Sequence, residues 1–115
     1  MKYMLVYYDD PASGGLDSDE RQEAYREACE DWQAEMASQG VLLQTMGLLP
    51  PDEATTVRVR DGKSLIADGP FAETREQMGG VSLLECVDLD QAQKMAARHP
   101  WSAIGLIEIR PIREQ

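Results

Sequence analysis

Hydrophobic residues are grouped along the chain in short runs that predict six β-strands. The first run, residues 2–8 (KYMLVYY), is apolar and aromatic, which is typical of a strand buried on both faces. Residues 55–60 (TTVRVR) alternate cleanly between apolar and polar, which predicts a strand with one face open to water or to a second layer. The other predicted strands span residues 41–49, 63–67, 81–87 and 103–112.

Two further segments carry apolar residues at steps of three and four, the spacing of an amphipathic helix. The first follows Asp17 and Ser18, either of which is a good N-cap. The second starts at Asp88, where Gln91 completes a capping box, and ends before Pro100. The stripe of the first helix, which we expect to lie in the core, consists of Tyr25, Ala28, Cys29, Trp32 and Met36.

The order of these elements predicts an α+β fold of the ferredoxin-like, split β-α-β type, with an extra hairpin. Asp61-Gly62 stands between two strand-like runs and is a strong signal for that hairpin. Right-handed crossovers place both helices on one face of the sheet. The other face then lacks a cover within this chain, and we expect a second copy to cover it in a two-fold homodimer.

Composition narrows the class of protein. The chain has 115 residues, which predicts a single domain over residues 1–115, and 43% of them are hydrophobic, as in ordinary globular proteins. Its net charge of −10 repels phosphates and argues against nucleic-acid binding. Apolar runs are too short to cross a membrane, and the start of the chain does not resemble a signal peptide. We therefore expect a cytoplasmic protein.

The residue types that bind metals and cofactors are few. Cys29 and Cys86 are far apart and form no CxxC pair, and the chain has one histidine. The pairs Gly14-Gly15 and Gly79-Gly80 lack the spacing of a phosphate-binding loop. We expect no metal site and no cofactor.

His99 has two interpretations. It falls in the last turn of the second predicted helix, where a cation is stabilised by the helix dipole and can bond free carbonyl groups. It is also the side chain whose ordinary pKa lies nearest neutrality, which makes it a candidate for acid–base catalysis. The helix-end interpretation is the simpler of the two.

The segment that begins at residue 68 reads as a specialised turn. Gly69 permits an unusual backbone angle, Pro70 fixes the next one, and the Phe71 ring is well suited to plug the core below. These three residues are accounted for by structure alone.

Turn geometry does not account for the charged residues around them. Asp68 and Glu73 lie close together in sequence with Arg75, and grouped carboxylates can serve as acid and base. Tyr8 and Asp9 end the first strand, where they can line a pocket between the sheet and a helix. These five residues are the candidate ligand-binding set.

Residues 68–80 (DGPFAETREQMGG) resemble the DGPFAETKEQLGG signature of the DGPF proteins, a branch of the YCII-related family. Resemblance extends over nearly the whole chain, including the opening MKYMLVYY and the terminal EIRPI. It implies a dimeric α/β-barrel arrangement, which agrees with the uncovered sheet face.

The resemblance leaves several functions open. Some members of the wider group are proposed to use a His–Asp pair, with the histidine near the first helix, but residues 9–40 contain none here. One hypothesis is a cleft near the DGPF turn that binds a small molecule, with lyase-like acid–base chemistry. The alternative is a regulatory module that acts with an extracytoplasmic-function sigma factor, since family genes often neighbour such genes. A third is a purely structural domain, so enzymatic activity stays open.

Overall fold

The computed structural model describes residues 1–72 and 76–114. In this part of the chain, four strands form one antiparallel sheet in the order β2-β5-β1-β6, and two more form a separate hairpin. The predicted interleaving of two β-α-β units is therefore confirmed, and the fold is α+β. The elements of the sheet layer are β1 (Lys2–Asp9), β2 (Leu42–Gly47), β5 (Met78–Glu85) and β6 (Gly105–Pro111). The helices are α1 (Asp19–Ser38) and α2 (Leu89–Arg98), and the hairpin consists of β3 (Thr55–Arg60) and β4 (Lys63–Asp68).

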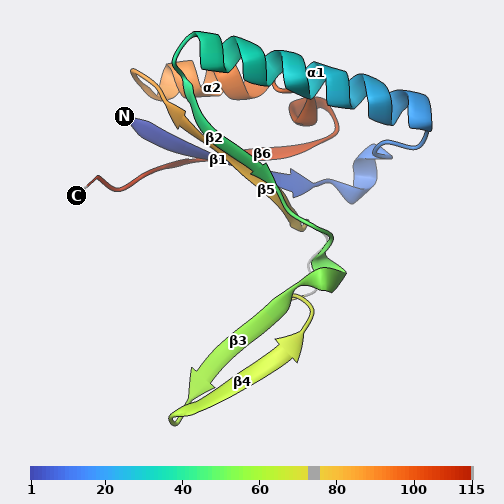
Figure 1. Cartoon of the computed structure of the whole chain (residues 1–115), viewed down its shortest axis with the longest axis vertical. Coiled ribbons are helices and arrows are strands. Elements are labelled where there is room, and N and C mark those ends of the chain that lie inside the picture. The colour runs from blue at the N-terminus through green and yellow to red at the C-terminus, as the bar shows by residue number, and fades with distance from the viewer. Residues whose placement is uncertain (73–75, 115) are drawn as a thin grey trace.

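Both helices pack on the same face of the sheet (Figure 1). Side chains of β1 alternate between the two faces, so Tyr3, Leu5 and Tyr7 point into the core. From α1, Trp32 and Met36 enter the same core, as their spacing predicts. The Trp32 indole also donates a hydrogen bond to the Met95 carbonyl in α2 at 3.0 Å, which joins the two helices.

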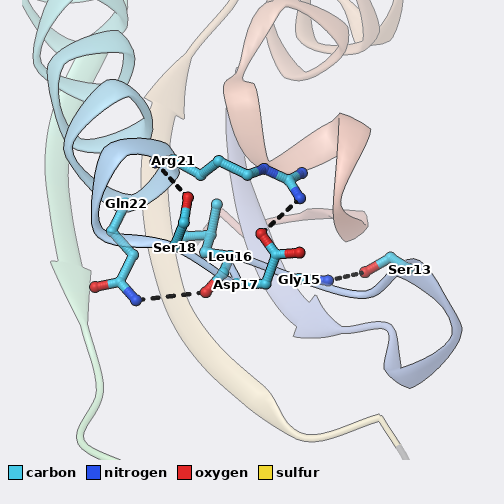
Figure 2. A network of polar contacts seen from close by, with 7 residues as sticks. All are labelled: Ser13, Gly15, Leu16, Asp17, Ser18, Arg21 and Gln22. Atoms are coloured by element: carbon cyan, nitrogen blue, oxygen red, sulfur yellow. Dashed lines mark hydrogen bonds and ion pairs between the residues drawn. The ribbon is translucent and has the colours of Figure 1, made fainter.

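The α1 helix begins where the sequence predicts. Ser18 is the N-cap, and its hydroxyl accepts a hydrogen bond from the Arg21 amide at 3.1 Å (Figure 2). Asp17 does not cap the helix but forms an ion pair of 3.0 Å with the Arg21 guanidinium. The side-chain amide of Gln22 donates a hydrogen bond to the Leu16 carbonyl. The local sequence thus defines how the chain enters the helix.

The α2 helix is capped as expected at Asp88, whose carboxylate accepts a hydrogen bond from the Gln91 amide at 2.9 Å. The side-chain oxygen of Gln91 accepts a hydrogen bond from the backbone amide of Val87, one residue before the cap. None of the helices in the described residues is long and apolar enough to cross a membrane.

The opposite face of the sheet is open in the single chain. Met4, Val6 and Tyr8 of β1 alternate with the core residues and point to this face, where Met4 and Tyr8 are half-buried and Val6 is buried by its neighbours. Val81 and Leu83 of β5 extend the apolar surface, since Val6 pairs with Val81 and Met4 with Leu83. A homodimer through this open face remains a prediction.

The β3–β4 hairpin turns at Asp61-Gly62, as predicted. Both residues have positive φ angles, 53° and 76°, which define the type I′ geometry that suits a two-residue hairpin loop. The hairpin projects away from the sheet and helices rather than joining them (Figure 1). Every residue of β4 is exposed.

We predict that Leu84→Ala lowers the free energy of unfolding by about 2–5 kcal/mol, because Leu84 is completely buried in the core. Val87→Ala is the control, since Val87 is exposed, and it should change stability by less than about 0.5 kcal/mol. Urea unfolding followed by circular dichroism measures both. Equal losses for the two variants would contradict this location of the core.

Candidate functional site

The structure separates the residues of the candidate set. Tyr8 and Asp9 lie at the end of β1, and the Asp9 amide donates to the Gln77 carbonyl at 3.0 Å. Asp68 lies at the end of β4, exposed and opposite Thr55 in the hairpin. Glu73 and Arg75 lie outside the described residues, so a cavity shared by Asp68 and Glu73 stays a prediction.

The DGPF turn has the backbone geometry that its glycine predicts. Gly69 has φ +93°, its amide donates to the Ala54 carbonyl at 2.7 Å, and its carbonyl accepts from the Thr56 hydroxyl at 2.8 Å. The expectation that Phe71 plugs the core is wrong for the single chain, because its side chain is 77% exposed. The turn extends the hairpin away from the core, and Phe71 lines a hollow on the hairpin together with Arg58 and Leu65 instead.

A pocket of about 180 Å³ lies between α1 and the sheet. One wall comes from α1 and the floor from the adjoining ends of β1, β2 and β5, while the segment after α2 closes one side. The lining residues are Tyr7, Tyr25, Cys29, Gln33, Thr45, Met46, Gly47, Gly79, Gly80, His99 and Trp101. These described residues include no Lys, Arg, Asp or Glu, and His99 is the one among them that ordinarily titrates near neutral pH.

A chain of hydroxyl groups forms part of this floor. The Tyr7 hydroxyl and the Ser82 hydroxyl lie 2.6 Å apart, and Ser82 lies 2.7 Å from the Thr45 hydroxyl. Ser82 is completely buried, so these bonds satisfy its polar group. Burial raises the pKa of Tyr7 to about 12, and the phenol therefore stays protonated at neutral pH.

His99 stands at the point where α2 ends and the chain turns toward β6. Its Nδ1 atom accepts a hydrogen bond from the Trp101 amide at 2.9 Å. Its ring is buried, stacked on Tyr7 with ring centres 4.8 Å apart, and meets Trp32 edge-on at 4.6 Å. Burial lowers the pKa of His99 to about 4.

The predicted role of His99 as a helix-end cation is therefore wrong. An imidazole whose Nδ1 accepts a hydrogen bond carries no proton on that atom, so we assign the proton of the neutral ring to Nε2. No protein hydrogen bond to Nε2 is found in the described residues, which also contain no buried side-chain polar atom without a partner. Nε2 consequently has accessible surface, and the ring lines the pocket.

Tyr25 and Cys29 face the pocket from α1. Burial raises the pKa values of both groups, with their mutual hydrogen bond adding to the rise at Tyr25. Cys29 is therefore a thiol at neutral pH and a poor nucleophile. Helical spacing predicts that these residues share a face with Trp32, but it does not show that a gap opens above them.

Two glycines let the backbone and an indole ring approach closely at this site. A Cβ atom on Gly80 would lie 2.8 Å from the Met46 carbonyl oxygen of β2. A Cβ atom on Gly105 would lie 2.2 Å from Nε1 of Trp101, which donates to the Tyr8 carbonyl at 2.9 Å. Gly105 therefore provides the space in which the Trp101 indole rests.

Among residues 1–72 and 76–114, no group of three or more His, Cys, Asp and Glu side chains converges to hold a metal ion. The absence of a cofactor stays an expectation from the sequence.

The chain is therefore a ferredoxin-like α+β protein with a pocket between α1 and the sheet. The model of the YCII-related domain matches residues 1–115, and the chain belongs to that family. An uncharacterised protein of Rhizobium meliloti (strain 1021), R00369, is 32% identical over 114 residues, which cover 97% of this chain and 92% of that protein.

A solved structure shares the fold. It is the 5-chloro-2-hydroxyhydroquinone dehydrochlorinase TftG from Burkholderia phenoliruptrix AC1100, in complex with 2,5-dihydroxybenzoquinone. The TM-score is 0.58 at 9% sequence identity, and the match covers 100% of this chain and 96% of TftG. At this identity the likeness concerns the fold alone.

We predict that protonation of His99 destabilises the folded protein in acid. The unfolded histidine, with an ordinary pKa near 6.5, binds a proton before the folded one does at about 4. The contribution of the neutral ring is therefore fully present above pH 6.5 and is lost as the pH falls toward 4. The His99→Asn variant keeps an acceptor for the Trp101 amide. Between pH 7 and 4 its free energy of unfolding should fall by about 2 kcal/mol less than that of the native protein, allowing for solvent screening.

Urea unfolding of both proteins at several pH values measures this difference, and carboxylates that titrate in the same range cancel in the comparison. Parallel losses of stability in the two proteins would contradict the burial of a neutral His99.

We also predict that Gly105→Ala displaces the Trp101 indole and lowers the free energy of unfolding by about 1–3 kcal/mol, the usual effect of overpacking. Near-ultraviolet circular dichroism reports the indole and urea unfolding the stability. Gly47→Ala is the matched control, because nothing lies within 4 Å of the added methyl group. An unchanged near-ultraviolet spectrum for Gly105→Ala would contradict the packing.

Proposed function

We propose that this chain binds a small, uncharged, single-ring molecule in the pocket between α1 and the sheet, and that the His99 Nε2–H group donates a hydrogen bond to an oxygen of that molecule. One observation carries the proposal. The Trp101 amide occupies Nδ1 of the neutral ring, which leaves Nε2 as its free donor at the pocket. A donor that is exposed at a pocket and has no protein partner is a specific site for a ligand oxygen.

The size of the pocket supports a single-ring ligand. A cavity of about 150 Å³ holds benzene, and this one measures about 180 Å³. Tyr25 and Trp101, whose ring centres lie 5.8 Å apart, offer flat apolar surface, and the hydroxyl of Thr45 offers a polar contact. The site therefore suits a flat ring that carries one or two polar substituents.

Electrostatics supports an uncharged ligand. The described lining residues provide no lysine, arginine or carboxylate, so a charged group would enter without a counter-charge. The net charge of −10 further disfavours anions. A neutral ligand avoids both penalties.

The chemistry that we propose is lyase-like. A hydrogen bond from Nε2 stabilises negative charge on a substrate oxygen while a neighbouring C–H bond loses its proton. We propose that this proton passes by way of a water molecule to Asp9, which lies outside the lining; its Oδ1 is 3.9 Å from the place that a Cβ atom on the lining residue Gly79 would occupy. The electron pair passes to the oxygen, and its return expels a leaving group. TftG, which shares the fold, is named a dehydrochlorinase, and this supports the reaction class.

The DGPF signature, residues 68–80, contributes its last two residues, Gly79 and Gly80, to the pocket lining. The bond from the Asp9 amide to the Gln77 carbonyl ties the end of β1 to the chain that follows the turn. Glu73 and Arg75, which lie outside the described residues, stay ligand-binding candidates from the sequence. The sigma-factor module and the purely structural domain predict instead that small molecules have no effect.

The test uses three ligands of one shape and different charge: benzamide, benzoate and benzamidine. We expect benzamide to bind and the two charged compounds to bind at least about tenfold more weakly, a difference of about 1.4 kcal/mol. The chain has two tryptophans, so its indole N–H groups give two reporter signals in ¹⁵N–¹H spectra. Benzamide should move the signal of Trp101, which lines the pocket, more than that of Trp32.

His99→Asn removes the Nε2 donor and should weaken benzamide binding about fivefold, the effect of one hydrogen bond of about 1 kcal/mol. Arg98→Ala is the control, because Arg98 pairs with Glu35 on the outer surface and should leave binding unchanged. Tighter binding of benzamidine would show a cation site, and no binding of any of the three would favour the interaction or structural alternatives. Either result contradicts the proposal.

A further inference from the structure

The β3–β4 hairpin, residues 55–68 and here called the arm, stands apart from the rest of the chain (Figure 1). A compact chain of this length has a radius of gyration of about 13 Å, whereas the observed value is 16.2 Å. An isolated two-stranded hairpin is at best marginally stable in water. Something outside the chain's own core is therefore needed to stabilise it.

The accessible surface of the chain is larger than that of a compact monomer of the same mass. The chain exposes 8057 Å², while a compact monomer of 12.8 kDa exposes about 6,300 Å². The excess is about 1,800 Å² per chain. Two copies that bury this excess would form an interface of about 3,600 Å², which lies within the range of obligate homodimers.

The arm has two different faces. Val57 pairs with Ile66, and Val59 lies on the same face two residues further along. Their side chains are 61%, 69% and 58% exposed, respectively, so this apolar face lacks a cover in the single chain. The opposite face carries Arg58 and Arg60.

Charge favours a second copy as the partner. The arm contains three of the chain's 11 basic residues and only two of its 21 acidic ones, so the rest of the chain is strongly acidic. The body also offers the sheet face away from the helices, where Met4, Val81 and Leu83 are half-buried in the single chain. Each copy therefore presents both surfaces, and a two-fold axis matches them in both directions at once.

We propose that the arm crosses to a second copy of this chain in a two-fold dimer, with its Val57, Val59 and Ile66 face packed on the other copy and its basic face toward acidic surface. The arm follows β2, whose Met46 and Gly47 belong to the floor of the pocket, so its docking also restrains that part of the floor. This inference is independent of the ligand proposal.

The first test is the mass of the native protein by sedimentation velocity between about 0.5 and 50 μM. We expect twice the chain mass. Ile66→Lys should weaken dimerisation at least about 30-fold, as at an interface hot spot. Leu65→Lys is the matched control, because Leu65 is also an exposed apolar residue of β4 but lies on the opposite face, across from Arg58. It should leave the dimer intact.

A native monomer at 50 μM would overturn the proposal. So would a dimer that resists Ile66→Lys, since the arm would then take no part, or equal weakening by both lysine variants, since the contact would not be specific to one face. If Ile66→Lys does not fold, hydrogen exchange of the native protein decides. Amides of residues 55–68 should lose protection on dilution below the dimer dissociation constant, and protection independent of concentration would refute the crossing.

Discussion

The hydrogen bond from the Trp101 amide to Nδ1 of His99 is the contact on which most of the site depends. It caps the start of the short helix, Pro100–Ala103, that follows α2 and carries Trp101. It also requires Nδ1 to be unprotonated, so the proton of the neutral ring lies on Nε2. The position of Trp101 then determines the rest, because its indole fills the space above Gly105 and bonds the Tyr8 carbonyl. One backbone amide thus joins helix capping, histidine chemistry and pocket shape.

The same helix, α1, serves both the core and the pocket. Toward its C-terminal end Trp32 and Met36 are buried against the sheet and α2. Tyr25 and Cys29, in the preceding turns, line the pocket, where the Tyr25 ring meets Trp101 edge-on. The pocket is therefore a place where packing between helix and sheet is incomplete, and its polar floor is satisfied by the hydroxyl chain that includes Ser82.

Stability and assembly are also divided between two regions. The core lies between the helices and one face of the sheet, where Leu5 and Leu84 are completely buried. The other sheet face and the arm expose apolar side chains that this core does not use. A single chain of 115 residues therefore leaves apolar area on these two surfaces that its own core does not cover.

The sequence by itself determined the elements and their order. Helical spacing, the caps at Ser18 and Asp88 and the Asp61-Gly62 turn are local signals, and each is confirmed because neighbouring residues decide it. The interleaved sheet and the placement of both helices on one face follow from the order of elements and the handedness of the connections.

Tertiary structure alone decided the chemistry. His99 looked like a helix-end cation, but contacts with rings from β1 and α1 desolvate it and keep it neutral. Phe71 looked like a core residue, but the hairpin extends the turn away from the core. Burial depends on segments distant in sequence, so local patterns could indicate which residues are apolar or titratable but not which of them meet around a pocket.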